Sequence, residues 1–459
     1  MSGYAGVLHK GAFVMGIVRS HGLAGLVLLF LLAVAVPARA FTVQQVVSPG
    51  GISAWLVEDH TLPVVSVAFG FAGGAATDPV GKEGRAYMTA AMLGEGAGKL
   101  DSQAFRRVLE TQAINLGYGS SMDATTGFLL TTTGTLDEAF DLLRLTLTAP
   151  RFDKAPLERL RHEYTASLSL KQEDPGDAAG RTMTALLFGD HPYARPLEGT
   201  PQSIRSMRVK DLRAHMKSSM TRDRLKIGVA GDLTPSQLGT LLDQTFGSLP
   251  ATGTAPAISP VVPALDGRVT VVDMDVPQSV VLFNDQGIDP RDPDIYAAML
   301  MDYVLGAGSF ASRLMNEVRE KRGLVYGIST SLRGLDKASF LSGHFATSGD
   351  KVAEAMDLVR AEWRKMAEDG VTEDELDAAK ANLAGSWPLG MTSTGNIANR
   401  LYDWQAYDRS PDYFNVRNAR LQAVTREDIK RVARRILDEK RLTFVIAGRP
   451  QGVESTPAP

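Results

Sequence analysis

The residues of this chain best suited to chemistry lie in one segment, Ser312–Gly327, which reads SRLMNEVREKRGLVYG. Arg319 lies one helical turn, about 6 Å, before Gly323, and Tyr326 lies about 10 Å along the strand expected after it. A chain reversal at Gly323 would bring guanidinium and phenol together, and both could donate hydrogen bonds to a carbonyl or to an oxyanion forming on it. The alternative is that Arg319 pairs with a neighbouring glutamate while Tyr326 packs in the core. From these residues alone we favour the alternative.

Histidine and cysteine offer no comparable set. No two histidines after residue 40 lie three or four positions apart, so no helix would present a two-histidine metal pair. His162-Glu163 resembles the start of H-E-x-x-H, but Ala166 breaks the motif. The absence of cysteine removes thiolate sites. Taken alone, these residues predict a protein without a metal site of its own.

The elements that must position these residues are written twice in the chain. Leu136–Arg144 (LDEAFDLLR) returns 216 positions later as Val352–Arg360 (VAEAMDLVR). Gly51 and Gly267 are also 216 positions apart, and Arg224–Asp232 (RLKIGVAGD) returns 217 positions later as RLTFVIAGR. A nearly constant offset indicates two copies of one folding unit of about 200 residues. Two such copies can enclose a site that neither would form alone.

Each copy combines strands with helices. In the first copy we expect β-branched strands at 51–58 and 63–71, a helix at 84–93, a hairpin at 114–133, helices at 136–147, 156–172, 177–188 and 209–216, and a closing buried strand at 224–230. In the second we expect strands at 268–273, 279–283, 324–332, 338–346 and 442–447, and helices at 295–305, 310–322, 352–367, 373–387 and 426–436. The pattern predicts the α+β class, with each half an antiparallel sheet packed with helices.

The domain boundaries follow from composition. Residues 249–265 hold four prolines, which is typical of an extended, semi-rigid connector. We divide the chain into a signal peptide (1–40), a first unit (41–248), a Pro-rich linker (249–265), a second unit (266–450) and a disordered tail (451–459). A net charge of −3 and a pI near 6.2 give no attraction to nucleic acid.

The N-terminus has the pattern of an export signal. Lys10 and Arg19 precede an apolar run of 14 residues, 23–36, and Pro37–Ala40 ends in a small-x-small cleavage site. The run is shorter than the roughly 20 residues a spanning helix needs. We therefore expect cleavage after Ala40, no stable membrane span afterwards and a periplasmic location; Met1 and Met15 both remain possible starts.

Two stretches, Gly189–Thr200 (GDHPYARPLEGT) and Ser312–Gly327, resemble signatures of the pitrilysin-like metallopeptidases, the inverzincin family that includes insulysin and mitochondrial processing peptidase. The resemblance covers the whole chain after residue 40, including the duplication. It implies two homologous α+β halves arranged as a clam around a peptide-binding cavity. It also implies that Arg319 and Tyr326 are the family's substrate-binding pair.

The same resemblance exposes a loss in the first half. The family's H-x-x-E-H motif falls on Gly84–Met92 (GRAYMTAAM), where Tyr87 replaces the first histidine, Ala90 the glutamate and Ala91 the second histidine. Alanine offers no lone pair, so we expect no cofactor in this chain.

The resemblance then implies a non-catalytic, substrate-binding subunit of an exported zinc metallopeptidase. Its partner would be a homologous H-x-x-E-H subunit that carries zinc, in a heterodimer acting on a peptide or an unfolded protein. The alternatives are a scaffold built on an inactive peptidase fold and a peptide-binding protein that acts alone.

Overall fold

The computed structural model describes residues 41–456. The expected signal peptide and the last three residues of the expected tail lie outside this range. Within it, no helix is long and apolar enough to cross a membrane.

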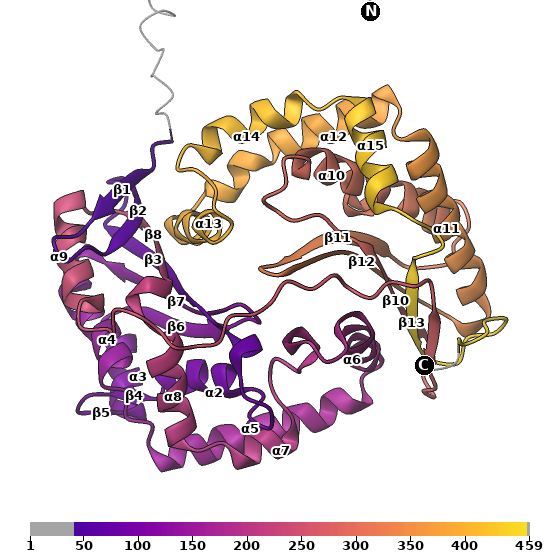
Figure 1. The fold of residues 1–459 in the computed structure, drawn as a ribbon. Helices are drawn as coiled ribbons and strands as arrows, with labels where there is room; N and C mark the ends of the chain where they lie inside the picture. Colours follow the sequence, from indigo (N-terminus) through magenta and orange to yellow (C-terminus); the bar gives the residue numbers. More distant parts are fainter. Residues whose placement is uncertain (1–40, 457–459) are drawn as a thin grey trace, which may run out of the picture. The chain divides into compact units, whose positions relative to one another are not determined.

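Among the described residues, the first half contains two β-sheets and eight α-helices (Figure 1). Its strands are β1 (Gln44–Val47), β2 (Ser53–Glu58), β3 (Val64–Ala72), β4 (Gly96–Ala97), β5 (Leu100–Asp101), β6 (Asn115–Ser120), β7 (Ala124–Thr132) and β8 (Leu225–Gly231). Its helices are α2 (Arg85–Leu93), α3 (Ser102–Thr111), α4 (Leu136–Thr148), α5 (Lys154–Glu173), α6 (Pro175–Phe188), α7 (Pro201–Ser206), α8 (Val209–Ser219) and α9 (Pro235–Phe246).

The second half repeats this plan with one sheet. Its strands are β9 (Val269–Val272), β10 (Ser279–Gln286), β11 (Ile328–Leu335), β12 (Ala338–Thr347) and β13 (Thr443–Ala447). Its helices are α10 (Ile295–Asp302), α11 (Val352–Asp369), α12 (Glu373–Gly385), α13 (Thr394–Ala406), α14 (Tyr413–Gln422) and α15 (Arg426–Ile436), with π-helical turns at Tyr303–Ala307 and Met315–Glu320.

The two large sheets share one strand order. The first runs β1-β2-β8-β3-β7-β6 and the second β9-β13-β10-β12-β11, so the second is the first without β1. The α+β prediction is confirmed, with one correction: neither sheet is purely antiparallel, because β2 pairs with β8, and β9 with β13, in parallel. These parallel pairs arise because the last strand of each half returns beside its opening strand.

Backbone conformation supports the duplication. Gly51 and Gly267, equivalent in the repeat, have φ of +83° and +78°. Gly231 and Gly448, which end the equivalent strands β8 and β13, have φ of +134° and +147°. Left-handed values of this kind favour glycine, so the repeat conserves turns as well as apolar residues.

The helices begin where local capping allows. Thr234 and Gln237 form a capping box at the start of α9, and Thr425 with Asp428 does the same for α15. The polar segment 114–133 forms the hairpin β6–β7, as predicted. Five helices were not predicted from the sequence: α3, α7, α9, α13 and α14.

One helix of each half packs against the sheet of the other half (Figure 1). Helix α13 packs on β8 and β3 of the first sheet, and α6 packs on β10 and β13 of the second. The two helices occupy the same place in the repeat, since each follows the second long helix after the hairpin. The opposite faces of the sheets carry each half's own helices, α4 and α9 in the first half and α11 and α15 in the second.

Helices α13 and α6 make different contacts with the sheets on which they pack. A Cβ added to Gly228 on β8 would lie 2.3 Å from the Ala398 carbonyl oxygen of α13, so this helix rests on the backbone of the strand. Helix α6 instead inserts large side chains: Phe188 meets Phe340 edge-on with ring centroids 6.0 Å apart, and Met183 and Leu187 join the same cluster.

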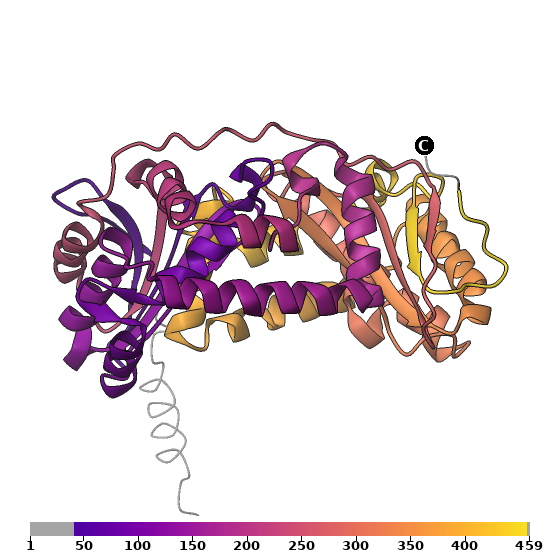
Figure 2. The same ribbon diagram turned by 90° about the horizontal axis from the view of Figure 1, so that it is seen from below.

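The expected linker contains no helix or strand from residue 253 to residue 268, and it crosses as an extended chain (Figure 2). It is hydrogen-bonded to neighbouring elements near its C-terminal end. Val261 N–H donates to the Lys337 carbonyl at 2.9 Å, and Ala264 N–H donates to the Leu187 carbonyl at 2.9 Å. The expected disordered tail lies against β9 as far as Thr456, whose N–H donates to the Val269 carbonyl at 2.7 Å.

Candidate functional site

The segment before Arg319 is not the single helix expected at 310–322. A 3-10 turn covers Ser309–Ala311, Ser312 is extended (φ −85°, ψ 153°), and the helix that follows widens into the π turn Met315–Glu320. The expected strand at 324–332 begins only at Ile328. Wide π turns are frequent at functional positions, because they turn a side chain away from the regular helical path.

The chain reverses at Gly323, as the spacing of Arg319 and Tyr326 required. Gly323 has φ +60°, its N–H donates to the Arg319 carbonyl at 2.8 Å, and Leu324 N–H donates to the Val318 carbonyl at 3.0 Å. These bonds satisfy carbonyl groups at the helix end and direct the chain toward β11. Tyr326 lies in the bend between this reversal and the strand.

The structure brings Arg319 and Tyr326 together. The Cζ atom of Arg319 lies 5.0 Å from the centroid of the Tyr326 ring and 4.7 Å from that of the Phe310 ring. The guanidinium therefore contacts two aromatic rings, an arrangement worth about 0.5–1 kcal/mol for each exposed ring. Phe310 was overlooked from sequence, although an aromatic residue directly after the Gly306–Ser309 turn (GAGS) was a usable signal.

Tyr326 does not pack in the core: it is 87% exposed, and its ring neighbour Phe310 is 64% exposed. Among the described residues, Glu320 at 3.5 Å is the carboxylate that pairs with the Arg319 guanidinium. Glu317 pairs instead with Lys321 and Arg322, whose hydrogen bonds lower the pKa of its carboxyl. The terminal N–H groups of Arg319 and the Tyr326 hydroxyl are thus left to donate to a ligand.

The candidate region of the first half is built around Tyr87. Its helix α2 is anchored by the buried pair of Arg85 and Asp78 (3.3 Å), and the Ala86 N–H donates to Asp78 at 3.1 Å. From this helix, the Tyr87 ring meets Tyr164 of α5 with centroids 5.2 Å apart. One turn further along α2, Ala90 is 3% exposed.

These residues do not fit a metal ion. Ala90 and Ala91 carry no donor atom, and burial raises the pKa of the Tyr164 phenol, which therefore stays protonated. Glu163, which directly precedes Tyr164 in the sequence, forms an ion pair with Arg159 at 2.9 Å. Between residues 41 and 456 no three histidine, cysteine or acidic side chains form a group that could hold a metal.

Two family models match the chain in succession. Insulinase (peptidase family M16) matches residues 54–201, and the peptidase M16 inactive domain matches residues 206–383. The non-peptidase homolog YmxG of Helicobacter pylori is 29% identical over 373 residues, which cover 80% of this chain and 84% of that protein.

The chain is also similar to a solved bacterial structure and to a subunit of a mitochondrial peptidase. The crystal structure of a peptidase M16 inactive domain from Pseudomonas fluorescens has a TM-score of 0.84 at 27% identity and covers 90% of this chain and 99% of that one. The mitochondrial-processing peptidase subunit beta of Blastocladiella emersonii is 26% identical over 274 residues, 58% of each chain.

Proposed function

The chain belongs to the insulinase (M16) peptidase family, and from this premise we propose that it is the non-catalytic, substrate-binding subunit of a two-subunit zinc metallopeptidase. Its partner would be a homologous chain with an intact H-x-x-E-H motif. Zinc in that partner would activate the attacking water. This chain would contribute Arg319 and Tyr326 to the binding of a peptide or unfolded protein.

One contrast carries the proposal. Where the family holds its metal ligands, the first half presents Tyr87 against Tyr164 and the methyl groups of Ala90 and Ala91. The second half keeps an arginine–tyrosine pair in which the Tyr326 ring is 87% exposed and the Arg319 guanidinium, paired with Glu320 through Nε, keeps its terminal N–H donors. A protein with only an architectural role has no physical need for this pair. The H. pylori relative's name, non-peptidase homolog, agrees with the loss in the first half.

Arg319 and Tyr326 would act on the substrate carbonyl. The guanidinium, oriented by Phe310 and Tyr326, offers charge-assisted N–H donors, and the phenol offers an O–H donor. Donors fixed before the reaction stabilise charge that develops on a carbonyl oxygen without having to reorganise. The substrate backbone would pair with a sheet edge such as β11, which begins two residues after Tyr326 and is an edge strand.

We also propose that the complex is exported, because the N-terminal pattern of Lys10, Arg19 and the apolar run 23–36 is typical of a cleaved signal. The periplasm is the compartment we propose. N-terminal sequencing of the protein recovered from a periplasmic extract tests this: a mature end at Phe41 supports it, and an intact N-terminus in the cytoplasmic fraction contradicts it.

The main experiment purifies the chain alone and after co-expression with an H-x-x-E-H family member from the same genome. We expect peptide cleavage and one zinc ion per pair only in the co-expressed complex. Arg319→Ala should lower its turnover by about 10²–10³-fold, the usual effect of removing one oxyanion donor. Arg322→Ala, which removes a nearby arginine paired with Glu317, is the matched control and should leave turnover unchanged. Stoichiometric zinc binding and peptide cleavage by the lone chain would refute the proposal.

The scaffold alternative makes a different prediction. If the chain serves only for assembly, Arg319→Ala combined with Tyr326→Phe leaves both complex formation and turnover intact. The solitary peptide-binding alternative predicts saturable binding of an unfolded peptide by the purified chain with no partner present. Fluorescence anisotropy of a labelled peptide separates the second case from the first.

A further inference from the structure

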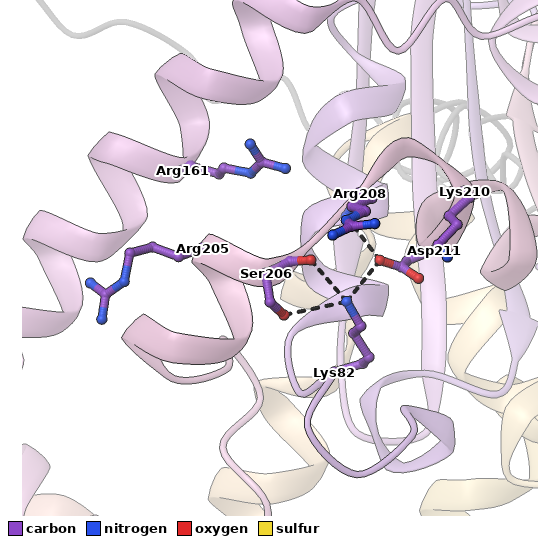
Figure 3. A pocket seen from close by; sticks show the side chains of 7 residues that line it. All are labelled: Lys82, Arg161, Arg205, Ser206, Arg208, Lys210 and Asp211. Carbon is purple, nitrogen blue, oxygen red and sulfur yellow. Dashed lines mark hydrogen bonds and ion pairs between the residues drawn. The ribbon is translucent and has the colours of Figure 1, made fainter.

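A second candidate site lies outside the region discussed so far, in a hollow of about 400 Å³ on the first half (Figure 3). Its walls come from the loop before α2, from α5, and from the turn between α7 and α8. The lining side chains are polar or charged: Lys82, Arg161, Arg205, Ser206, Arg208, Lys210 and Asp211. Five of these are cationic and one is acidic, although the whole chain carries a net charge of −3.

Two of the five cations form the frame of the hollow. Lys82 Nζ donates to the Ser206 carbonyl at 2.8 Å and to Asp211 at 3.0 Å, which ties the loop before α2 to the α7–α8 turn. Arg161 reaches from α5 toward the same turn and pairs with Glu158 at 2.6 Å (Figure 3). The Arg161 Nε is buried and has no hydrogen-bond partner among the described residues.

The other three cations are not neutralised. Arg205, Arg208 and Lys210 are exposed, and among the described residues no carboxylate pairs with their side chains. With Lys82 balanced by Asp211, and Arg161 by Glu158, the hollow keeps an excess of three positive charges. These three charges line one hollow without carboxylate partners among the described residues, so their combined field attracts an anion.

A pocket of the second half shows that such an excess is not general in this protein. There Arg291 pairs with Asp336 at 2.8 Å and Asp408 at 2.9 Å, and Arg431 pairs with Asp294 at 2.6 Å. Its principal arginines are thus neutralised within the chain. The hollow of the first half lacks these internal counter-charges.

We propose that the hollow lined by Arg161, Arg205, Arg208 and Lys210 is a binding site for an anion with two or more linked phosphate groups. Guanidinium groups match phosphate oxygens in a forked geometry. No aromatic or large apolar side chain lines the hollow, so a base, a sugar ring or an apolar peptide side chain would find no packing surface. A compact, multiply charged anion matches both the volume and the excess charge. It could come from a free pyrophosphate-like compound or from a phospholipid headgroup.

The experiment measures binding of inorganic pyrophosphate to the full chain by isothermal titration calorimetry, with inorganic phosphate and citrate as comparison anions. We expect saturable binding of one pyrophosphate per chain, weaker at higher salt because screening reduces the attraction. The variant Arg205→Ser/Arg208→Ser/Lys210→Ser should bind at least about tenfold more weakly. Citrate binding as tight as that of pyrophosphate would overturn the phosphate assignment.

A matched control removes three exposed cations elsewhere on the same half: Lys99→Ser/Arg107→Ser/Lys154→Ser. It changes the net charge equally and should leave pyrophosphate affinity unchanged. Equal loss in both triple variants, or no binding by the native chain at low salt, would refute the site. Sedimentation with phosphatidylcholine vesicles, with and without phosphatidylglycerol, identifies the source: retention only on the anionic vesicles, lost in the first triple variant, assigns a headgroup. Pyrophosphate binding without retention assigns a free anion.

Discussion

Helices α13 and α6 each cover one face of the other half's sheet, but through different contacts. Helix α13 lies directly on the backbone of β8 because Gly228 leaves no side chain between them. Helix α6 stands on side chains, with Phe188, Met183 and Leu187 filling the space above β10 and β13. A duplicated fold can therefore keep an element while replacing the physical contact that holds it. The α13 contact has no space to spare, whereas the α6 contact can adjust its side chains.

The largest expected effect comes from adding one methyl group at the α13 contact. Gly228→Ala places a Cβ 2.3 Å from the Ala398 carbonyl oxygen, which forces α13 away from the sheet. We expect the free energy of unfolding to fall by about 3 kcal/mol, at the upper end of overpacking costs. Urea denaturation measures it.

Gly180→Ala on α6 is the control, because nothing lies within 4 Å of its added Cβ. Alanine favours the helix, so this variant should be up to about 1 kcal/mol more stable. A similar loss in both variants would remove the distinction between the two contacts.

Two buried groups, His215 in the first half and Asp302 in the second, should make opposite contributions to the pH dependence of stability. Burial lowers the pKa of His215, whose Nε2 lies 2.9 Å from the Thr125 hydroxyl, to about 3. The unfolded chain binds a proton at His215 near pH 6.5 and the native chain does not. The free energy of unfolding therefore falls as the pH drops below 6.5. We expect His215→Gln to reduce the acid sensitivity by about 2 kcal/mol at pH 5, measured by urea unfolding at pH 5 and pH 7.5.

In the second half, burial raises the pKa of the Asp302 carboxyl to about 6, despite hydrogen bonds from Thr330 and the Leu332 N–H. Its stabilising contribution is present below about pH 4, where both states are protonated, and is lost as pH rises through 6. Relative to the wild type, Asp302→Asn should gain about 2–3 kcal/mol between pH 4.5 and pH 7.5. Parallel pH profiles for the variant and the wild type would contradict this assignment.

The smallest expected difference is between the two equivalent glycines that open the halves, because Lys440, which faces Gly267, lies in an exposed turn that can shift. Both have left-handed φ, so alanine at either costs about 1 kcal/mol or slightly more. Gly51 has nothing within 4 Å of an added Cβ, whereas at Gly267 it would lie 1.9 Å from the Lys440 carbonyl oxygen. Gly267→Ala should therefore lower the melting temperature further than Gly51→Ala in differential scanning calorimetry.

Sequence predicted the elements with clear local signals. The hairpin β6–β7 and helices α4 and α15 were found because their periodicity or capping is visible in a short window. Helix α9 was overlooked although its Thr234–Gln237 capping box was readable. Helix α13 (TGNIANRLYDWQA) has few charged residues to contrast with its buried face, and its partner sheet lies in the other half, so local pattern could not place it.

The candidate site divides in the same way. Spacing around Gly323 predicted that Arg319 and Tyr326 would meet, because a single reversal connects them. The π turn and the contact of Phe310 with the guanidinium depend on packing against neighbouring elements, which a short stretch of sequence does not reveal. The family resemblance located Tyr87, but its ring contact with Tyr164 required the structure.

Because α6 and α13 each pack on the sheet of the other half, neither half forms a complete folding unit by itself. A protease cut within residues 253–268, followed by separation of the fragments, would strip each sheet of the helix that shields one side and lay its apolar surface open to water. A gene encoding just one repeat would face the same problem, and two of its products could solve it only by trading this helix.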